Sequence, residues 1–221
     1  SIQMRYQKLI EEAPSPFVDE DLRVRLGEAA VKIARAIDYH NAGTMEFLVD
    51  KDKNFYFMEV NARVQVEHPV TEWITGMDIV REQIRIADGG TLTLSQADIR
   101  LSGWSFECRI NACDPDDNFM PSPGMIESVS FPGGPGIRLD THIHHQYMVT
   151  PYYDSLIGKL TTWDTDRPAA LARMRRALDE FKVTGIKTTV DFFKDIFDDP
   201  DFRAGDMDTH FLDRKQTGRE E

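Results

Sequence analysis

The chain has 221 residues, and its content of 41% hydrophobic and 10% aromatic residues is enough for one large or two small domains. The net charge of −12 argues against nucleic acid or an anionic membrane as the main partner, because phosphate groups would be repelled. The only two cysteines, Cys108 and Cys113, form neither a metal-type cluster nor a disulfide framework. Without a signal peptide or an apolar run of about 18 residues, the sequence predicts a soluble protein.

The first predicted element is an amphipathic helix that follows Pro14-Ser15-Pro16. Asp19 or Asp21 can cap its start. Apolar residues then recur at helical spacing, namely Leu22, Leu26, Ala29, Ile33 and Ile37. The pattern ends near residues 41–43. We expect this helix to pack on the apolar face of the element that follows.

Residues 43–50 and 54–60 both have strand patterns, and the short polar link between them predicts a β-hairpin. If Asp50 pairs with Phe55, Glu46 lies directly opposite Glu59, with Leu48 and Phe57 beside the two acids. The same register predicts three pairs on the apolar face, which are Met45 with Val60, Phe47 with Met58, and Val49 with Tyr56. A slip of one residue would move the acids to different faces.

Directly opposed like charges destabilise a strand pair, so the sequence predicts a cation between Glu46 and Glu59. Carboxylates with a nearby amide oxygen are hard donors, and neither a thiolate nor an imidazole accompanies them. Such a set suits Mg²⁺ or Mn²⁺ held together with substrate phosphates.

From Glu59 onward, polar residues occupy every second position: Glu59, Asn61, Arg63, Gln65 and Glu67. Small apolar residues alternate with them, and His68-Pro69 closes the run. In an extended chain the polar side chains form one row on one face. A solvated edge strand needs only generic soluble residues, so this particular mixture favours a binding site.

The remaining elements follow in chain order. A helix starts at residues 75–78 and stops at Gly89-Gly90, with Ile79, Val80, Ile84 and Ala87 predicted to face inward. A polar stretch at 91–101 suggests a domain boundary. Beyond it we expect strands near 104–111, 126–131 and 159–163, and helices near 167–182 and 188–197. The Gly133-Gly134-Pro135-Gly136 segment leads into no helical pattern and predicts a tight turn.

Several ordered motifs resemble biotin carboxylase, an enzyme family of the ATP-grasp superfamily. The strongest is the segment from Phe57 to Glu72, preceded by Gly43-Thr44-Met45-Glu46-Phe47. Further segments match in the expected order: residues 3–8, 11–14, 106–112, 121–124, 151–155 and 185–188. The resemblance implies an α+β fold, with residues 1–95 as the C-terminal portion of an ATP-grasp domain and residues 96–221 as the biotin carboxylase C-terminal domain.

The resemblance also implies an ATP-dependent ligase that carboxylates biotin on a carrier protein with bicarbonate, through carboxyphosphate. Glu46, Glu59 and Asn61 match the ligands of Mg²⁺ or Mn²⁺, and the two acids also belong to the ATP site. Bicarbonate would bind Arg63, Gln65 and the backbone N–H of Val66. Glu67 matches the general base, and Arg109 matches the residue that stabilises the biotin enolate. Arg109 could instead form a structural ion pair with Glu107 or Glu67.

Two positions depart from the family pattern near the nucleotide. Gln3 matches a nucleotide contact, but Tyr6 stands where the family usually has a histidine that contacts the ribose, and Met4 where it usually has an arginine. A phenol still donates a hydrogen bond, so we expect weaker ATP contact. Pro135 replaces an aromatic residue of the bacterial dimer interface although Arg138 is retained, which leaves a homodimer open.

The chain begins at Ser1 without methionine, and we interpret it as a fragment that lacks the N-terminal domain and ATP lid and is inactive alone. The implied partners are a biotin carboxyl carrier, a carboxyltransferase and that missing half. The expected location is the cytoplasm, or the mitochondrial matrix in a eukaryote. Two other functions stay open: another bicarbonate-using ligase of the carbamoyl-phosphate synthetase type, and a non-catalytic interaction module. His142, His144 and His145 are expected on the surface rather than at a metal.

Overall fold

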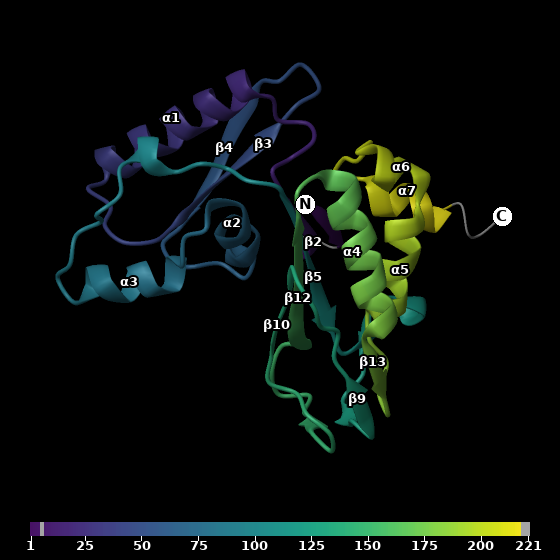
Figure 1. Cartoon of the computed structure of the whole chain (residues 1–221). Helices are drawn as coiled ribbons and strands as arrows, with labels where there is room; N and C mark the ends of the chain where they lie inside the picture. The colour runs from purple at the N-terminus through teal and green to yellow at the C-terminus, as the bar shows by residue number, and fades with distance from the viewer. Residues whose placement is uncertain (5–6, 218–221) are drawn as a thin grey trace. The chain divides into compact units, whose positions relative to one another are not determined.

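The computed structural model describes residues 1–4 and 7–217 and contains two compact units (Figure 1). The hairpin unit comprises Pro14–Leu101. The sheet unit combines Ser1–Ala13 with the described residues from Ser102 onward. Both units mix helices with antiparallel sheets, which confirms the predicted α+β class. None of the described helices has the length and hydropathy needed to span a membrane.

The hairpin unit is built from one hairpin and three α-helices. Its elements are α1 (Glu20–Ala36), β3 (Thr44–Val49), β4 (Phe55–Asn61), α2 (His68–Thr75) and α3 (Ile79–Ala87), followed by a short 3-10 turn, η1 (Gln96–Asp98). Asp19 caps α1 by accepting from the backbone N–H of Leu22 at 2.9 Å, as predicted. The helix ends at Ala36, earlier than its apolar pattern suggested. The Arg25 guanidinium lies 5.8 Å from the Phe55 ring centroid, so α1 lies on the Phe55 face of the hairpin.

The predicted hairpin register is confirmed near the acids, but the prediction is wrong near the turn. Glu46 pairs with Glu59 and Met45 with Val60, but Phe47 then pairs with Phe57, and Met58 is left as a β-bulge. Val49 accordingly pairs with Phe55, and Leu48 with Tyr56. The extra residue reverses the faces of the strand beyond it.

Phe57 therefore joins Phe47 on the apolar face, with ring centroids 5.9 Å apart. Tyr56 takes the place predicted for Phe57, beside Leu48 on the face of the acids. Its hydroxyl donates to Asp50 Oδ2 at 3.2 Å. The predicted pairs Phe47–Met58 and Val49–Tyr56 do not form, because sequence alternation cannot reveal an inserted residue.

Helix α2 was not predicted from the sequence. His68-Pro69, interpreted there as the end of the polar row, instead begins the helix, since Pro is favoured in a first helical turn. Helix α3 was predicted, and Asp78 caps it by accepting from Arg81 N at 2.8 Å. The assignment of its inward face was wrong, however. Ile84 is 65% exposed and Val80 37% exposed.

The sheet unit has a five-stranded antiparallel sheet in the order β1-β2-β5-β12-β10. Its strands are β1 (Ile2–Met4), β2 (Gln7–Ala13), β5 (Trp104–Asn111), β10 (Ile137–Thr141) and β12 (Leu156–Asp164). Three two-stranded pairs flank it: β6 (Cys113–Asp114) with β7 (Met120–Pro121), β8 (Gly124–Met125) with β11 (Met148–Val149), and β9 (Ser128–Ser130) with β13 (Lys182–Thr184). A 3-10 turn, η2 (Pro115–Asp117), lies between β6 and β7.

Helices cover one face of this sheet (Figure 1). They are α4 (Arg167–Glu180), α5 (Val190–Asp198), α6 (Pro200–Ala204) and α7 (Phe211–Thr217). The buried side of α4 packs on β5 and β12. The core is rich in phenylalanine, and its fully buried rings are Phe106, Phe181, Phe193, Phe197, Phe202 and Phe211. Cys108 and Cys113 are buried and unbonded, and burial raises the pKa of the Cys113 thiol to about 11.

A buried ion pair ties the first strands to the helices of the sheet unit. Arg167 Nε on α4 lies 2.6 Å from Glu12 Oε1 on β2, and both side chains are at least 88% buried. Trp104 Nε1 donates to the same carboxylate oxygen at 2.6 Å, while Arg167 also donates to the carbonyl oxygens of Phe202 and Arg203. Burial raises the pKa of Glu12, although Arg167 and Trp104 oppose this shift.

The loop predictions for the sheet unit are confirmed. Residues 134–136 form a tight turn that leads into β10, with positive φ at Gly134 and Gly136. His142, His144 and His145 are exposed. Across the described residues, no group of three or more His, Cys, Asp or Glu side chains is placed to hold a metal ion.

Candidate functional site

The hairpin unit carries the predicted acids on its polar face. Glu46 on β3 and Glu59 on β4 are directly opposed. The Asn61 amide lies between them, with Nδ2 3.0 Å from Glu46 Oε1 and 2.9 Å from Glu59 Oε1. The register thus brings two carboxylates and one amide together, as the sequence predicted.

Gln65 and Arg63 join the same hydrogen-bonded network. Gln65 Nε2 donates to Glu46 Oε1 at 2.8 Å. Arg63 Nη2 donates to Asn61 Oδ1, and Nη1 to the Val64 carbonyl oxygen, both at 3.3 Å. The side chains of Arg63 and Glu59 are exposed, so ligands can reach them.

The predicted polar row is not one continuous strand. β4 ends at Asn61, and residues 62–67 form a bend and a turn that lead into α2. Beyond Asn61 the polar side chains no longer alternate between two faces of a strand, because the backbone turns into α2. Glu67 consequently occupies the position just before the first residue of α2.

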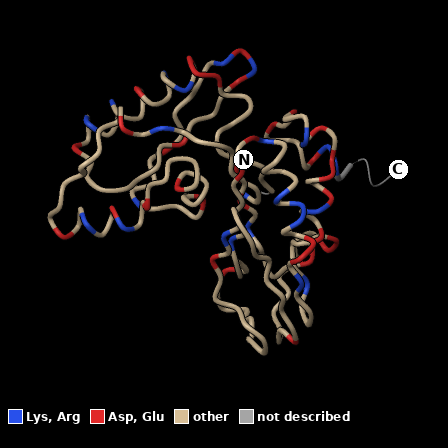
Figure 2. Tube along the Cα trace, viewed as in Figure 1, with Lys and Arg blue, Asp and Glu red and all other residues tan. Residues whose placement is uncertain are grey.

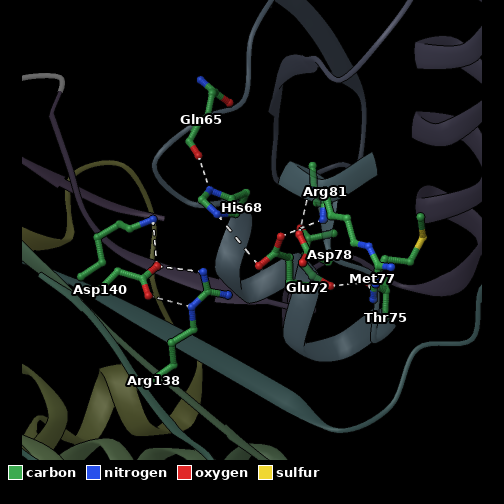
Figure 3. A network of polar contacts seen from close by, with 12 residues as sticks. Gln65, His68, Glu72, Thr75, Met77, Asp78, Arg81, Arg138 and Asp140 are labelled. Atoms are coloured by element: carbon green, nitrogen blue, oxygen red, sulfur yellow. Dashed lines mark hydrogen bonds and ion pairs between the residues drawn. The ribbon is translucent and has the colours of Figure 1, made fainter. Parts of the chain in front are cut away.

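A second polar network holds this turn in place (Figure 3). His68 Nδ1 lies 2.8 Å from the Gln65 carbonyl oxygen, and His68 Nε2 lies 4.0 Å from Glu72 Oε2. Glu72 Oε1 accepts from the backbone N–H of Ile79 at 2.8 Å. The turn is therefore linked through α2 to the first residue of α3. His68 thus connects the turn to α2 through both of its ring nitrogens.

Arg109 lies in β5 of the sheet unit. Its Nη2 is 3.2 Å from Glu11 Oε1 on the neighbouring strand β2. The sequence had proposed Glu107 or Glu67 as structural partners and missed Glu11, which becomes a neighbour only when β2 pairs with β5. Gln3 lies in β1, opposite Lys8. Tyr6 lies outside the described residues.

Arg138 belongs to an ion-pair cluster on the outer strands of the sheet unit (Figure 3). Its Nε and Nη2 donate to the two carboxylate oxygens of Asp140 at 2.9 and 2.8 Å, and Lys159 Nζ lies 3.5 Å from Asp140 Oδ2. Burial tends to raise the pKa of Asp140, but Arg138 and Lys159 together lower it.

The hairpin site fits a hard divalent cation. Carboxylates are donors that Mg²⁺ and Mn²⁺ accept, and Mg²⁺ is commonly held by one or two carboxylates plus substrate phosphates. The two opposed acids match that pattern, while Asn61 here points its Nδ2, not its oxygen, at both of them. The forked guanidinium of Arg63 suits a planar carboxylate-like anion next to the cation.

Comparison with known proteins finds two protein-family models that match this chain, one in each half. The model of the carbamoyl-phosphate synthase L chain, ATP binding domain, matches residues 1–95, and that of the biotin carboxylase C-terminal domain matches residues 107–214. The chain is 55% identical to biotin carboxylase of Nostoc sp. over 96% of its own length and 47% of that protein. Along nearly its whole length the chain is similar to about half of a biotin carboxylase, and this confirms the resemblance seen in the sequence.

Other relatives agree. The chain is 50% identical to biotin carboxylase 1 of Bacillus subtilis, covering 96% of this chain and 48% of that protein. It matches the biotin carboxylase domain of Hydrogenobacter thermophilus 2-oxoglutarate carboxylase with a TM-score of 0.96 and 50% identity, over 98% of this chain and 48% of that one. That crystal structure contains MgADP, ADP and bicarbonate. The chain thus spans about half the length of these relatives.

Proposed function

We propose that this chain is part of an ATP-dependent ligase that carboxylates biotin on a carrier protein, using bicarbonate and forming carboxyphosphate. The observation that supports it most is the hydrogen-bonded set of Glu46, Glu59, Asn61, Arg63 and Gln65, in a chain similar to about half of a biotin carboxylase. A relative with half the sequence in common binds MgADP and bicarbonate. The same ligands suit the donors found here.

Glu46 and Glu59 would hold Mg²⁺ or Mn²⁺, with Asn61 as a third ligand, and both acids belong to the ATP site. When bound, the cation neutralises charge on ATP oxygens during phosphoryl transfer. The two acids come from adjacent strands of one hairpin and would hold the cation there, next to the phosphates. Gln3 and Tyr6 are the further residues that we assign to the nucleotide.

Arg63, Gln65 and the backbone N–H of Val66 would bind bicarbonate. Glu67 would take the bicarbonate proton, and its position just before α2 fixes its backbone. Arg109 would stabilise negative charge on the biotin ring. In the free chain Arg109 is held by Glu11, which orients the guanidinium along the sheet.

In this proposal, residues 1–95 come from an ATP-grasp domain and residues 96–221 form the biotin carboxylase C-terminal domain. The two family matches support this division. β2 nevertheless pairs with β5, and β1 pairs with β2, so the first residues of the former segment complete the sheet of the latter. The partners would be a biotin carboxyl carrier, a carboxyltransferase and the other half of the enzyme, with a homodimer as a further expectation and the cytoplasm as the location.

The test uses the full-length protein that contains this sequence. We expect ATP cleavage that depends on bicarbonate, rises with free biotin and yields carboxybiotin. A carbamoyl-phosphate synthetase type of ligase would consume an amine donor and form no carboxybiotin. A protein that cleaves no ATP under either condition would instead be a non-catalytic module.

A further inference from the structure

Glu46 Oε1 accepts hydrogen bonds from two amides. Asn61 Nδ2 lies 3.0 Å away and Gln65 Nε2 lies 2.8 Å away. Asn61 Nδ2 also donates to Glu59 Oε1 at 2.9 Å. One NH₂ group therefore bridges the opposed carboxylates, where like charges would otherwise destabilise the strand pair.

The direction of the Asn61 amide follows from its other contact. Arg63 Nη2 donates to Asn61 Oδ1 at 3.3 Å, and a guanidinium can only donate. The carbonyl oxygen of Asn61 thus turns toward Arg63, and its NH₂ group turns toward the acids. In this orientation the amide offers hydrogens, not an oxygen, to the space between Glu46 and Glu59.

We propose that Asn61 is an exchangeable cross-link. Without metal, its NH₂ group joins the two acids as a substitute for a cation. When a divalent cation enters, the amide turns over, releases both carboxylates, and presents Oδ1 to the cation. The proposal rests on the proposed metal site and adds to it a role for Asn61 when no metal is bound.

Gln65 has a different task in this exchange. A carboxylate oxygen accepts more than one hydrogen bond, so Gln65 Nε2 can stay on Glu46 Oε1 while the cation binds. Such outer contacts orient metal ligands. Release of Asn61 therefore withdraws its NH₂ group from both acids, while Gln65 stays on Glu46. The turned amide presents its NH₂ group to Arg63, so the hydrogen bond from Arg63 Nη2 to Asn61 Oδ1 is given up as well.

The experiment compares the 221-residue chain with Asn61→Ala and, as a matched control, Asn41→Ala. Asn41 lies in the same unit and donates to the Gln83 carbonyl oxygen, away from the acids. Backbone amide hydrogen exchange of residues 44–61 is measured with and without Mn²⁺. Mn²⁺ binding is followed by the loss of the electron paramagnetic resonance signal of the free ion. Without metal, we expect several-fold faster exchange in Asn61→Ala only. Mn²⁺ should slow that exchange again, while changing the wild type little.

Asn61→Asp keeps the size of the side chain and provides a second test of the proposal. It should bind Mn²⁺ about tenfold more tightly or better, since ligand charge strongly tunes divalent affinity, and show the largest Mn²⁺-dependent protection. If Mn²⁺ binds the wild type but Asn61→Ala exchanges at the wild-type rate without metal, the cross-link is refuted and the metal site stands. If Mn²⁺ does not bind the wild type, both the exchange and the proposed metal site are refuted.

Discussion

Glu46 and Glu59 carry like charges and lie directly opposite each other in the hairpin, so the stability of this pair depends on the group between them. In the structure that is Asn61, held in turn by Arg63. Glu67 is held by the turn into α2, and Arg109 by Glu11 in the sheet unit. The role proposed for each side chain can therefore be tested by a single substitution.

Glu46→Gln and Glu59→Gln in the full-length enzyme should each raise the Mg²⁺ concentration needed for half-maximal ATP cleavage. Each removes the charge of a proposed metal ligand, so we expect at least the roughly 10–100-fold loss known for outer-shell partners. The control is Glu82→Gln on α3, an acid paired with Arg85 away from the site. An unchanged Mg²⁺ dependence in both site variants would contradict the assignment.

Glu67 and Arg109 should affect different steps. Glu67→Gln keeps the shape but loses the base, so bicarbonate-dependent ATP cleavage should fall by roughly 10²–10⁴. Arg109→Met should cripple carboxybiotin formation and leave more of the ATP cleavage, because its charge acts on biotin. Both reactions are measured for both variants. Normal ATP cleavage by Glu67→Gln, or wild-type carboxybiotin formation by Arg109→Met, would show that role to be wrong.

At the scale of elements, the sequence predicted the hairpin, α1, α3, α4, α5 and β5 from local periodicity and caps. It did not predict α2, because residues 68–75 are short and their helix depends on Pro69 in the first turn and Gly76 at the end. It also gave no strand for 1–13. Within those residues β2 pairs with β5, a contact across more than ninety positions of sequence, and β1 pairs with β2.

The ion pair between Glu12 and Arg167 makes that long-range pairing testable. Arg167→Met leaves a buried acid unpaired, which should lower the free energy of unfolding by about 3–5 kcal/mol at neutral pH. The pKa of Glu12 is already raised by burial, and loss of Arg167 raises it further. A raised carboxyl pKa favours the folded state at low pH, and that contribution is lost as pH rises through the folded-state pKa. The deficit should therefore shrink as pH falls toward the usual value of 4.5.

Urea unfolding at neutral and mildly acidic pH measures this effect. The control is Arg175→Met on the same helix, whose partners Asp179 and Asp198 are more than half exposed. Partly exposed pairs contribute roughly 0–1 kcal/mol. Equal losses in the two variants, or a deficit for Arg167→Met that does not change with pH, would contradict the role of the buried pair.

At the scale of the whole molecule, the two units differ in burial. The large core cluster lies in the sheet unit. Within the described part of the hairpin unit, the buried aliphatic residues are Leu22, Val70 and Ile74. Aromatic side chains such as Tyr56 and Phe57 are half exposed there, while acidic and basic residues alternate along α3 (Figure 2).

The 221-residue chain alone should not show bicarbonate-dependent ATP cleavage. It spans about half the length of its relatives, and phosphoryl transfer depends mainly on positioning, which a single hairpin with two acids does not supply. Phosphate release is measured beside the full-length enzyme at equal concentration. Turnover comparable to that of the full-length enzyme would refute this expectation.

The sequence by itself determined the resemblance to biotin carboxylase, through its ordered motifs, and the pairing of Glu46 with Glu59, through local alternation. It also located the starts of α1 and α3, although it left Asp19 and Asp21 open as the first cap and did not single out Asp78 as the second. Tertiary structure decided the rest. The bulge at Met58 is fixed by packing of Phe47, Phe55 and Phe57. The place of β2 is fixed by pairing with β5, and that of β1 by pairing with β2. Contacts between distant residues leave no periodic signal, so only the folded chain reveals them.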